Sequence, residues 1–422
     1  MKYLISDVQL VSGEHTDLFV AEGSFRDPAD ASGDVTRIDA SGLIALPGLV
    51  DLHTHLREPG REDAETIASG TKAAARGGYT CVHAMANTDP VADTAEAVEH
   101  VLEVGLAEGS AQVVPVGAVS KGLEGQELAE LGLMARSKAR TRFFSDDGKC
   151  VADSLLMRRA LSYVTAFDGV IAQHSQDPRL AGAGACCHES EWSGRLGLPG
   201  WPAQAESVIV ARDVQLAELT GARLHVCHVS TAESVEVIRW AKKRGIRVTA
   251  EATPHHLYLD VSNVEGYDTT YKVNPPLATN EHIEAVREAL ADGTIDAVAT
   301  DHAPHNPQDK DHPFDVALPG MLGLEQSLAV VMETMLNPGR ITWETLAERM
   351  SYAPARIGQV ANQGRALAVG EPANLVLVDP SARATVDKNA SLSRSRNNPY
   401  HGRELPDPVV LTMWAGDVTY GR

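Results

Sequence analysis

The sequence predicts an α/β fold: a (β/α)8 TIM barrel with a small β-sandwich domain built from both chain termini. Three observations predict it. Apolar runs recur eight times between residues 43 and 305, helical patterns separate most of them, and both chain ends carry short strand-like runs instead. Eight strand–helix units in about 250 residues is the usual size of such a barrel. A doubly wound open sheet is the alternative that this pattern leaves open.

The eight expected strands share an apolar character and a turn or polar residue at the end. They are residues 43–55, 80–87, 112–119, 141–148, 169–175, 223–230, 247–256 and 295–305. The clearest helical patterns lie at 62–78, 94–109, 153–167, 207–221 and 231–245. Ser230 and Glu233 have the spacing of a capping box at the start of the last of these helices.

The two chain ends resemble each other more than they resemble the middle. Neither end alone looks like a domain, so we expect them to pair into one small sheet beside the barrel. The expected boundaries place residues 1–46 and 365–422 in this composite β domain, and residues 47–364 in the barrel.

Composition narrows the classes of function. The formal net charge of −20 argues against nucleic acid and anionic membranes as partners, because both favour a basic surface. The N-terminus lacks the features of a signal peptide, and no apolar window is long enough to span a membrane. Five cysteines without a C-x-x-C pair argue against disulfides and structural zinc. We therefore expect a cytoplasmic protein.

The stretch VDLHTHLREPG, residues 50–60, ends the first expected strand. Side chains alternate along a strand, so His53, His55 and Arg57 should point the same way. At the carboxyl end of a barrel strand that direction is the active-site mouth. Two imidazoles so placed can grip one metal ion, although an H-x-H pair alone is weak evidence.

Four other strand ends carry potential ligands. They are Asp146 or Asp147, His174, His228 and Asp301. Four imidazoles and two carboxylates suit Zn²⁺ or a similar divalent ion, and six ligands suit two ions rather than one. Strand alternation lets only one of Asp146 and Asp147 face inward, and spacing alone does not decide which.

Seven motifs in order resemble dihydroorotases, a family within the amidohydrolase superfamily, and most of all the bacterial type I branch. DLHTHLREP (51–59) and ATDHAPHNPQDK (299–310) are similar to the two signature stretches of that family. The further matches are residues 85–88, 144–148, 225–231, 253–257 and 271–277, so that the resemblance covers essentially the whole chain.

The resemblance implies a zinc-dependent hydrolase acting on a cyclic amide. Such enzymes interconvert N-carbamoyl-L-aspartate and L-dihydroorotate, the third step of pyrimidine biosynthesis, through a hydroxide that bridges two zinc ions. By resemblance His53, His55 and Asp301 hold one ion, His174 and His228 hold the other, and Asp147 bridges them. Asp301 would also act as general acid and base.

The resemblance also implies how the substrate is held. Arg57, Asn87 and His305 would bind its carboxylate, since a guanidinium fork matches a carboxylate. Asn274 would bind the amide edge of the ring. Pro319 and Gly320 stand where the family usually has Phe-Gly in a substrate loop, so the glycine is retained and the aromatic residue is not.

Several readings remain open at this point. Another cyclic amidase, such as a hydantoinase or allantoinase, shares the barrel and the metal site, and a non-catalytic scaffold for aspartate carbamoyltransferase (aspartate transcarbamoylase) shares the chain pattern. The chain could form a homo-oligomer or bind that transcarbamoylase while active. The remaining histidines of the motifs are expected to pack or to hydrogen-bond rather than to bind metal; they are His83, His225, His255, His256 and His302.

Overall fold

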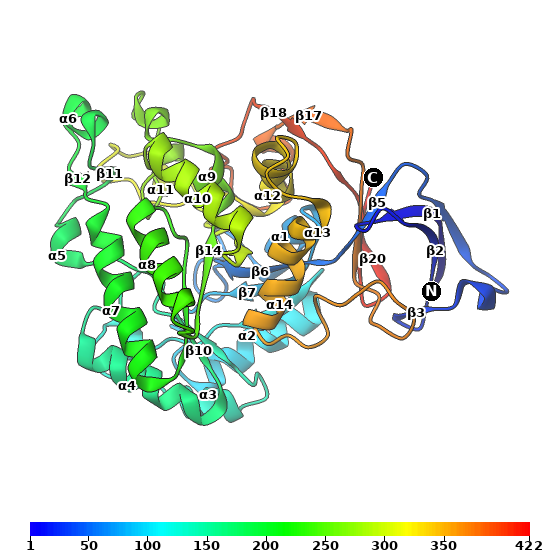
Figure 1. The fold of residues 1–422 in the computed structure, drawn as a ribbon, viewed down its shortest axis with the longest axis horizontal. Helices are drawn as coiled ribbons and strands as arrows, with labels where there is room; N and C mark the ends of the chain where they lie inside the picture. Colours follow the sequence, from blue (N-terminus) through cyan, green and yellow to red (C-terminus); the bar gives the residue numbers. More distant parts are fainter.

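The computed structural model describes residues 1–422 and contains the expected barrel (Figure 1). Its eight strands are β6 (Leu49–Thr54), β7 (Tyr79–Ala84), β8 (Gln112–Pro115), β9 (Phe143–Phe144), β10 (Val170–Gln173), β13 (Arg223–Val226), β14 (Val248–Ala252) and β15 (Ala297–Val298). They pair in parallel as β6-β7-β8 and β9-β10-β13-β14-β15. Parallel bridges from Gly117 to Phe144 and from Thr54 to His302 join the two groups. The sheet is therefore closed, and the open-sheet alternative is wrong.

Helices follow the strands around the barrel. They are α1 (Ile67–Arg76), α2 (Ala95–Glu108), α3 (Leu131–Arg136), α4 (Ser154–Val164), α7 (Gln204–Thr220), α8 (Ala232–Lys243), α10 (Asn280–Asp292), α12 (Ser327–Val331), α13 (Trp343–Ala347) and α14 (Ala353–Ile357). Short elements lie in the loops: α5 (Pro178–Ala181), β11 (Cys187–His188), α6 (Glu191–Leu196), β12 (Gly200–Trp201), α9 (Pro254–Tyr258) and α11 (Pro307–Lys310). None of the helices combines the length and apolar character that crossing a membrane requires.

The cap of α8 differs from the expectation. The helix begins after Thr231, whose hydroxyl accepts the backbone N–H of Ser234. Ser230 instead donates its hydroxyl to the carboxylate of Glu206, at 2.5 Å. The Ser230–Glu233 capping box is therefore wrong, because a distant buried carboxylate binds the serine that the local pattern assigned to the cap.

Both chain ends build one sheet beside the barrel, as expected (Figure 1). Its strands are β1 (Lys2–Leu10), β2 (His15–Ala21), β3 (Ser24–Arg26), β4 (Thr36–Asp39), β5 (Ile44–Pro47), β16 (Leu375–Val378), β19 (Val409–Trp414) and β20 (Asp417–Gly421). The N-terminal β5 pairs antiparallel with the C-terminal β16, which joins the two ends. The boundaries near residues 46 and 365 stay a prediction.

A long excursion between β16 and β19 returns to the mouth of the barrel. It contains β17 (Arg383–Thr385) and β18 (Glu404–Pro406), which pair with each other. Within it, the buried Asn397 donates to the carbonyls of Ala303 and Gly320 and accepts the backbone N–H of His305. The C-terminal segment thus supports the loop that follows β15.

Candidate metal centre

Six expected ligands meet at the carboxyl ends of the barrel strands. His53 belongs to β6, and the other five follow the ends of β6, β9, β10, β13 and β15; they are His55, Asp147, His174, His228 and Asp301. All six are at most 5% exposed. The barrel topology therefore brings together side chains that lie up to 248 residues apart.

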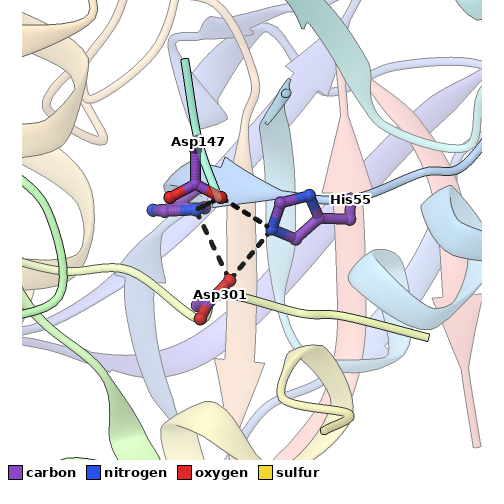
Figure 2. Close-up of side chains that lie close together, drawn as sticks. His55, Asp147 and Asp301 are labelled. Atoms are coloured by element: carbon purple, nitrogen blue, oxygen red, sulfur yellow. Dashed lines mark hydrogen bonds and ion pairs between the residues drawn. The ribbon is translucent and has the colours of Figure 1, made fainter. Parts of the chain in front are cut away.

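Four of these side chains form one group. His53 Nε2 lies 3.3 Å from Asp147 Oδ2 and 3.4 Å from Asp301 Oδ1. His55 Nε2 lies 3.0 Å from the same Asp301 oxygen and 3.3 Å from Asp147 Oδ2. Figure 2 shows His55, Asp147 and Asp301 pointing toward one another. One cation could contact all four side chains.

A second group lies on the other side of Asp147. Its Oδ1 atom is 3.1 Å from His174 Nδ1 and 3.2 Å from His228 Nε2. These two ring nitrogens are themselves 2.9 Å apart. Asp147 therefore directs one oxygen at each group, which is the arrangement of a carboxylate that bridges two ions.

The neighbouring Asp146 forms hydrogen bonds to other residues, away from the imidazoles. Its carboxylate accepts the backbone N–H groups of Val119 and Ser120, at 2.8 and 2.9 Å, and the hydroxyl of Ser120. Of the two aspartates, only Asp147 reaches the imidazoles.

The donor set fits divalent metal ions. His53 Nε2 and His228 Nδ1 are buried without a hydrogen-bond partner. Burial opposes ionisation of Asp147, but the neighbouring His53, His174 and His228 outweigh it and hold its pKa well below the usual value. Burial acts likewise on Asp301, and His53 and His55 lower its pKa. Two ionised carboxylates among four imidazoles, all nitrogen and oxygen donors, suit a binuclear site.

Three of the four imidazoles form a hydrogen bond through the ring nitrogen that faces away from the other ligands. His53 Nδ1 lies 2.8 Å from Glu251 Oε1. His55 Nδ1 lies 2.9 Å from Asn87 Oδ1, and His174 Nε2 lies 2.9 Å from Gln176 Oε1. Sequence reasoning missed Glu251, Gln176 and Asn397. Only Glu251 could have been noticed from the sequence, because it is the one charged residue of β14.

A cavity of about 270 Å³ opens above the ligands. All six residues expected to bind substrate line it; they are Arg57, Asn87, Asn274, His305, Pro319 and Gly320. Burial and the nearby Arg61 lower the pKa of Arg57 to about 10, so the guanidinium remains cationic at neutral pH. Burial, Arg57 and Lys310 lower the pKa of His305 to about 3, so that its ring is neutral there.

The other motif histidines lie outside the two ligand groups. His256 bonds Thr253 and the carbonyl of Pro275, and His302 contacts Glu65 and accepts the backbone N–H of Gly323. His83 lies 2.9 Å from the carbonyl of Asp51. The buried His255 packs against His256. His225 is fully buried, as expected, but its ring bonds the carboxylate of Glu251.

The closed barrel and its buried His/Asp centre, which fits metal ions, agree with the class of amidohydrolases, whose family model matches residues 199–419. The dihydro-orotase-like model matches residues 42–234. Dihydroorotases of Leifsonia xyli and Streptomyces coelicolor are each 56% identical over 99% of this chain, which covers 95% and 98% of theirs. The chain belongs to the dihydroorotase family and is a cyclic amidohydrolase.

Solved structures support the fold alone. An L-hydantoinase from Arthrobacter aurescens superposes with a TM-score of 0.88 at 24% identity, covering 99% of this chain and 96% of that one. A dihydropyrimidinase from Brevibacillus agri gives 0.85 at 23% identity, covering 99% and 95%.

Proposed function

We propose that this chain interconverts N-carbamoyl-L-aspartate and L-dihydroorotate, the ring-closing step of pyrimidine synthesis, with two zinc ions per chain. The observation that carries the proposal is one cavity with metal ligands at its base and the half-buried guanidinium of Arg57 on its wall. A cyclic amide bearing a carboxylate needs both features, because the amide must be activated and the carboxylate must be neutralised.

The cavity wall offers the groups that this substrate requires. The guanidinium of Arg57 can donate two parallel hydrogen bonds to the carboxylate, and Asn87 and His305 line the same cavity. Asn274 donates to Gln176, while its own Oδ1 is buried without a partner. That oxygen is free to accept an N–H of the ring.

Gly320 is required by the shape of the wall. Its φ is 138°, and a Cβ there would lie 2.8 Å from both Ala303 Cβ and His305 Nε2. Its backbone N–H is held by the carbonyl of Lys272, at 2.9 Å, and Pro319 accepts from His305. The Pro319–Gly320 turn therefore forms a fixed wall beside the substrate carboxylate, in place of the aromatic residue usual in the family.

The two ligand groups support a division of the side chains between two ions. His53, His55 and Asp301 would hold one ion, His174 and His228 the other, and Asp147 both. Zinc ions there supply a water activated as a nucleophile and polarisation of the ring carbonyl.

Asp301 moves the proton. In hydrolysis its carboxylate accepts a proton as water oxygen adds to the ring carbonyl carbon. It then delivers that proton to the ring nitrogen as the C–N bond breaks. In ring closure the same carboxylate takes the proton from the carbamoyl nitrogen and returns it to the departing water.

Two alternatives have less support. Hydantoinases share the fold, but the L-hydantoinase named above is 24% identical to this chain, whereas the two dihydroorotases are 56% identical. A non-catalytic scaffold does not need six intact ligands. A cytoplasmic location, a homo-oligomer and an association with aspartate carbamoyltransferase stay predictions.

The test compares substrates on the purified, zinc-loaded chain. We expect turnover of dihydroorotate, and turnover of hydantoin and allantoin roughly 10- to 150-fold lower, which corresponds to one lost charge-assisted contact of about 1.5–3 kcal/mol. Equal turnover of hydantoin would contradict the proposal, and no turnover of any of the three by a chain holding two zinc ions would favour the scaffold.

A further inference from the structure

Beneath the metal centre, a row of buried, hydrogen-bonded side chains crosses the barrel interior. Glu251 in β14 is completely buried and divides its two oxygens between two histidines. Its Oε1 lies 2.8 Å from His53 Nδ1 and accepts the backbone N–H of His228 at the longer distance of 3.4 Å. Its Oε2 lies 2.9 Å from His225 Nε2. His225 Nδ1 in turn lies 2.8 Å from the hydroxyl of Thr249.

The hydrogen bonds in this row of side chains fix the position of a ring proton of His53. An ionised carboxylate has only acceptor atoms, so each imidazole must present an N–H to it. When a metal ion takes Nε2, which lies 3.3 and 3.4 Å from Asp147 and Asp301, the one remaining ring proton of His53 therefore stands on Nδ1. A histidine in the other tautomer would present a proton to a metal ion and could not bind it.

The partner of His53 differs in kind from those of the other ligands. His55 and His174 are held by the neutral amides of Asn87 and Gln176, and His228 Nδ1 has no partner. Of the four imidazoles, only that of His53 has a carboxylate partner on the ring nitrogen that faces away from the other ligands. A carboxylate forms the stronger hydrogen bond and makes the imidazole a better electron donor to a metal ion.

We propose that Glu251, itself held by His225, is a positioning residue that sets the tautomer and orientation of His53 and so governs the affinity of the metal ion His53 binds. This rests on the two-metal site proposed above. Glu251 does not line the cavity, so we expect no contact between it and the substrate. It acts through His53, and its effect should fall mainly on one of the two ions.

Metal affinity tests the proposal directly. Zinc is titrated into metal-free chain against a chromogenic chelator, for the wild type, Glu251→Ala and Glu251→Gln. We expect Glu251→Ala to weaken one of the two sites by about 10- to 100-fold and to leave the other within a few-fold. In Glu251→Gln the amide oxygen can still accept the His53 proton while the NH2 faces His225. This variant should recover part of the affinity, with a loss near the low end of that range.

The visible absorption spectrum of the cobalt-loaded chain gives a second readout. Loss of the His53 restraint should alter the bands of one Co²⁺ ion, a change that destabilisation elsewhere does not produce. Glu325→Ala is the matched control, because Glu325 is also a buried carboxylate, 4% exposed, but its partners are Arg76, Ser391 and Leu392. Its zinc affinity and cobalt spectrum should equal those of the wild type.

Each outcome is decisive. If Glu251→Ala does not fold, Glu251→Gln decides alone, and wild-type affinity in that variant overturns the proposal. Equal losses at both sites, or in Glu325→Ala as well, also overturn it. A third ion in the wild-type chain that is lost in Glu251→Ala would make Glu251 a ligand and overturn the proposal, since His53, Cys227 and Glu251 also lie within reach of one ion. Failure of the wild type to bind two ions would instead overturn the two-metal site itself.

Discussion

Arg57 Nη2 lies 3.5 Å from His305 Nε2, on the wall of the cavity whose base is formed by the metal ligands. The guanidinium is fixed there because its Nε donates to the carbonyl of Pro304, at 3.1 Å. Because this cation lines the same cavity as the metal ligands, it is the group that we propose binds the substrate carboxylate.

Arg57→Ala should therefore impair substrate use and spare the metal site. Loss of a charge-assisted contact of about 1.5–3 kcal/mol corresponds to a fall of roughly 10- to 150-fold in kcat/KM for dihydroorotate. Arg57→Lys keeps the positive charge but lacks the two-pronged guanidinium, so its kcat/KM should lie between those of the wild type and Arg57→Ala. Steady-state kinetics with zinc analysis checks this, and zinc loss equal to the activity loss would contradict the assigned role.

Asp147 and Asp146 form a natural pair of variants. Asp147→Asn should reduce bound zinc below two per chain and abolish most activity, because its two oxygens face different ligand groups. Asp146→Asn should keep both zinc ions but lower the free energy of unfolding by about 1–3 kcal/mol, since it disturbs the hydrogen bonds to Val119 and Ser120. Elemental analysis and denaturant unfolding separate the two, and the reverse pattern would exchange their roles.

Asp301→Asn should slow turnover by about 10²- to 10⁴-fold through loss of proton transfer. Asparagine can still offer an oxygen to a metal ion, so zinc content should fall less than in Asp147→Asn. Single-turnover kinetics on zinc-loaded protein checks this, and near-normal rates would show that another group moves the proton.

Zinc binding should release protons and weaken as the pH falls. In the metal-free chain burial disfavours protonation of His53, but Asp147 and Asp301 outweigh it and raise its pKa well above the usual value. The pKa of His174 is raised in the same way, mainly by Asp147. Below these raised pKa values zinc must displace protons, so its affinity falls with decreasing pH through neutrality. Calorimetry in buffers of different ionisation enthalpy measures this release, and a pH-independent affinity would contradict it.

Gly320→Ala should distort the cavity wall. The added Cβ would meet Ala303 and His305, and overpacking of this kind costs about 1–3 kcal/mol. We expect a raised KM for dihydroorotate with zinc content unchanged. Unchanged kinetics would show that the turn moves freely and does not shape the site.

Much of this site could be predicted from the sequence because the barrel topology brings the carboxyl ends of all its strands to the same rim. Once His53, His174, His228 and Asp301 are assigned to strand ends, closure of the sheet brings them together without further information. The choice of Asp147 over Asp146 depends on Ser120, which binds the other carboxylate from a separate loop.

What the sequence could not provide is contact between distant side chains. Glu251 contacts His53 across 198 residues, and Asn397 contacts His305 across 92 residues. No local spacing encodes such pairs. For the same reason Ser230 looked like a helix cap, whereas Glu206 binds it.

The most direct measurement is anomalous diffraction at the zinc edge from crystals of the zinc-loaded chain. Two peaks are expected, one beside each carboxylate oxygen of Asp147, the first near His53, His55 and Asp301 and the second near His174 and His228. A single peak, or a peak beside Asp146, would contradict a binuclear centre bridged by Asp147.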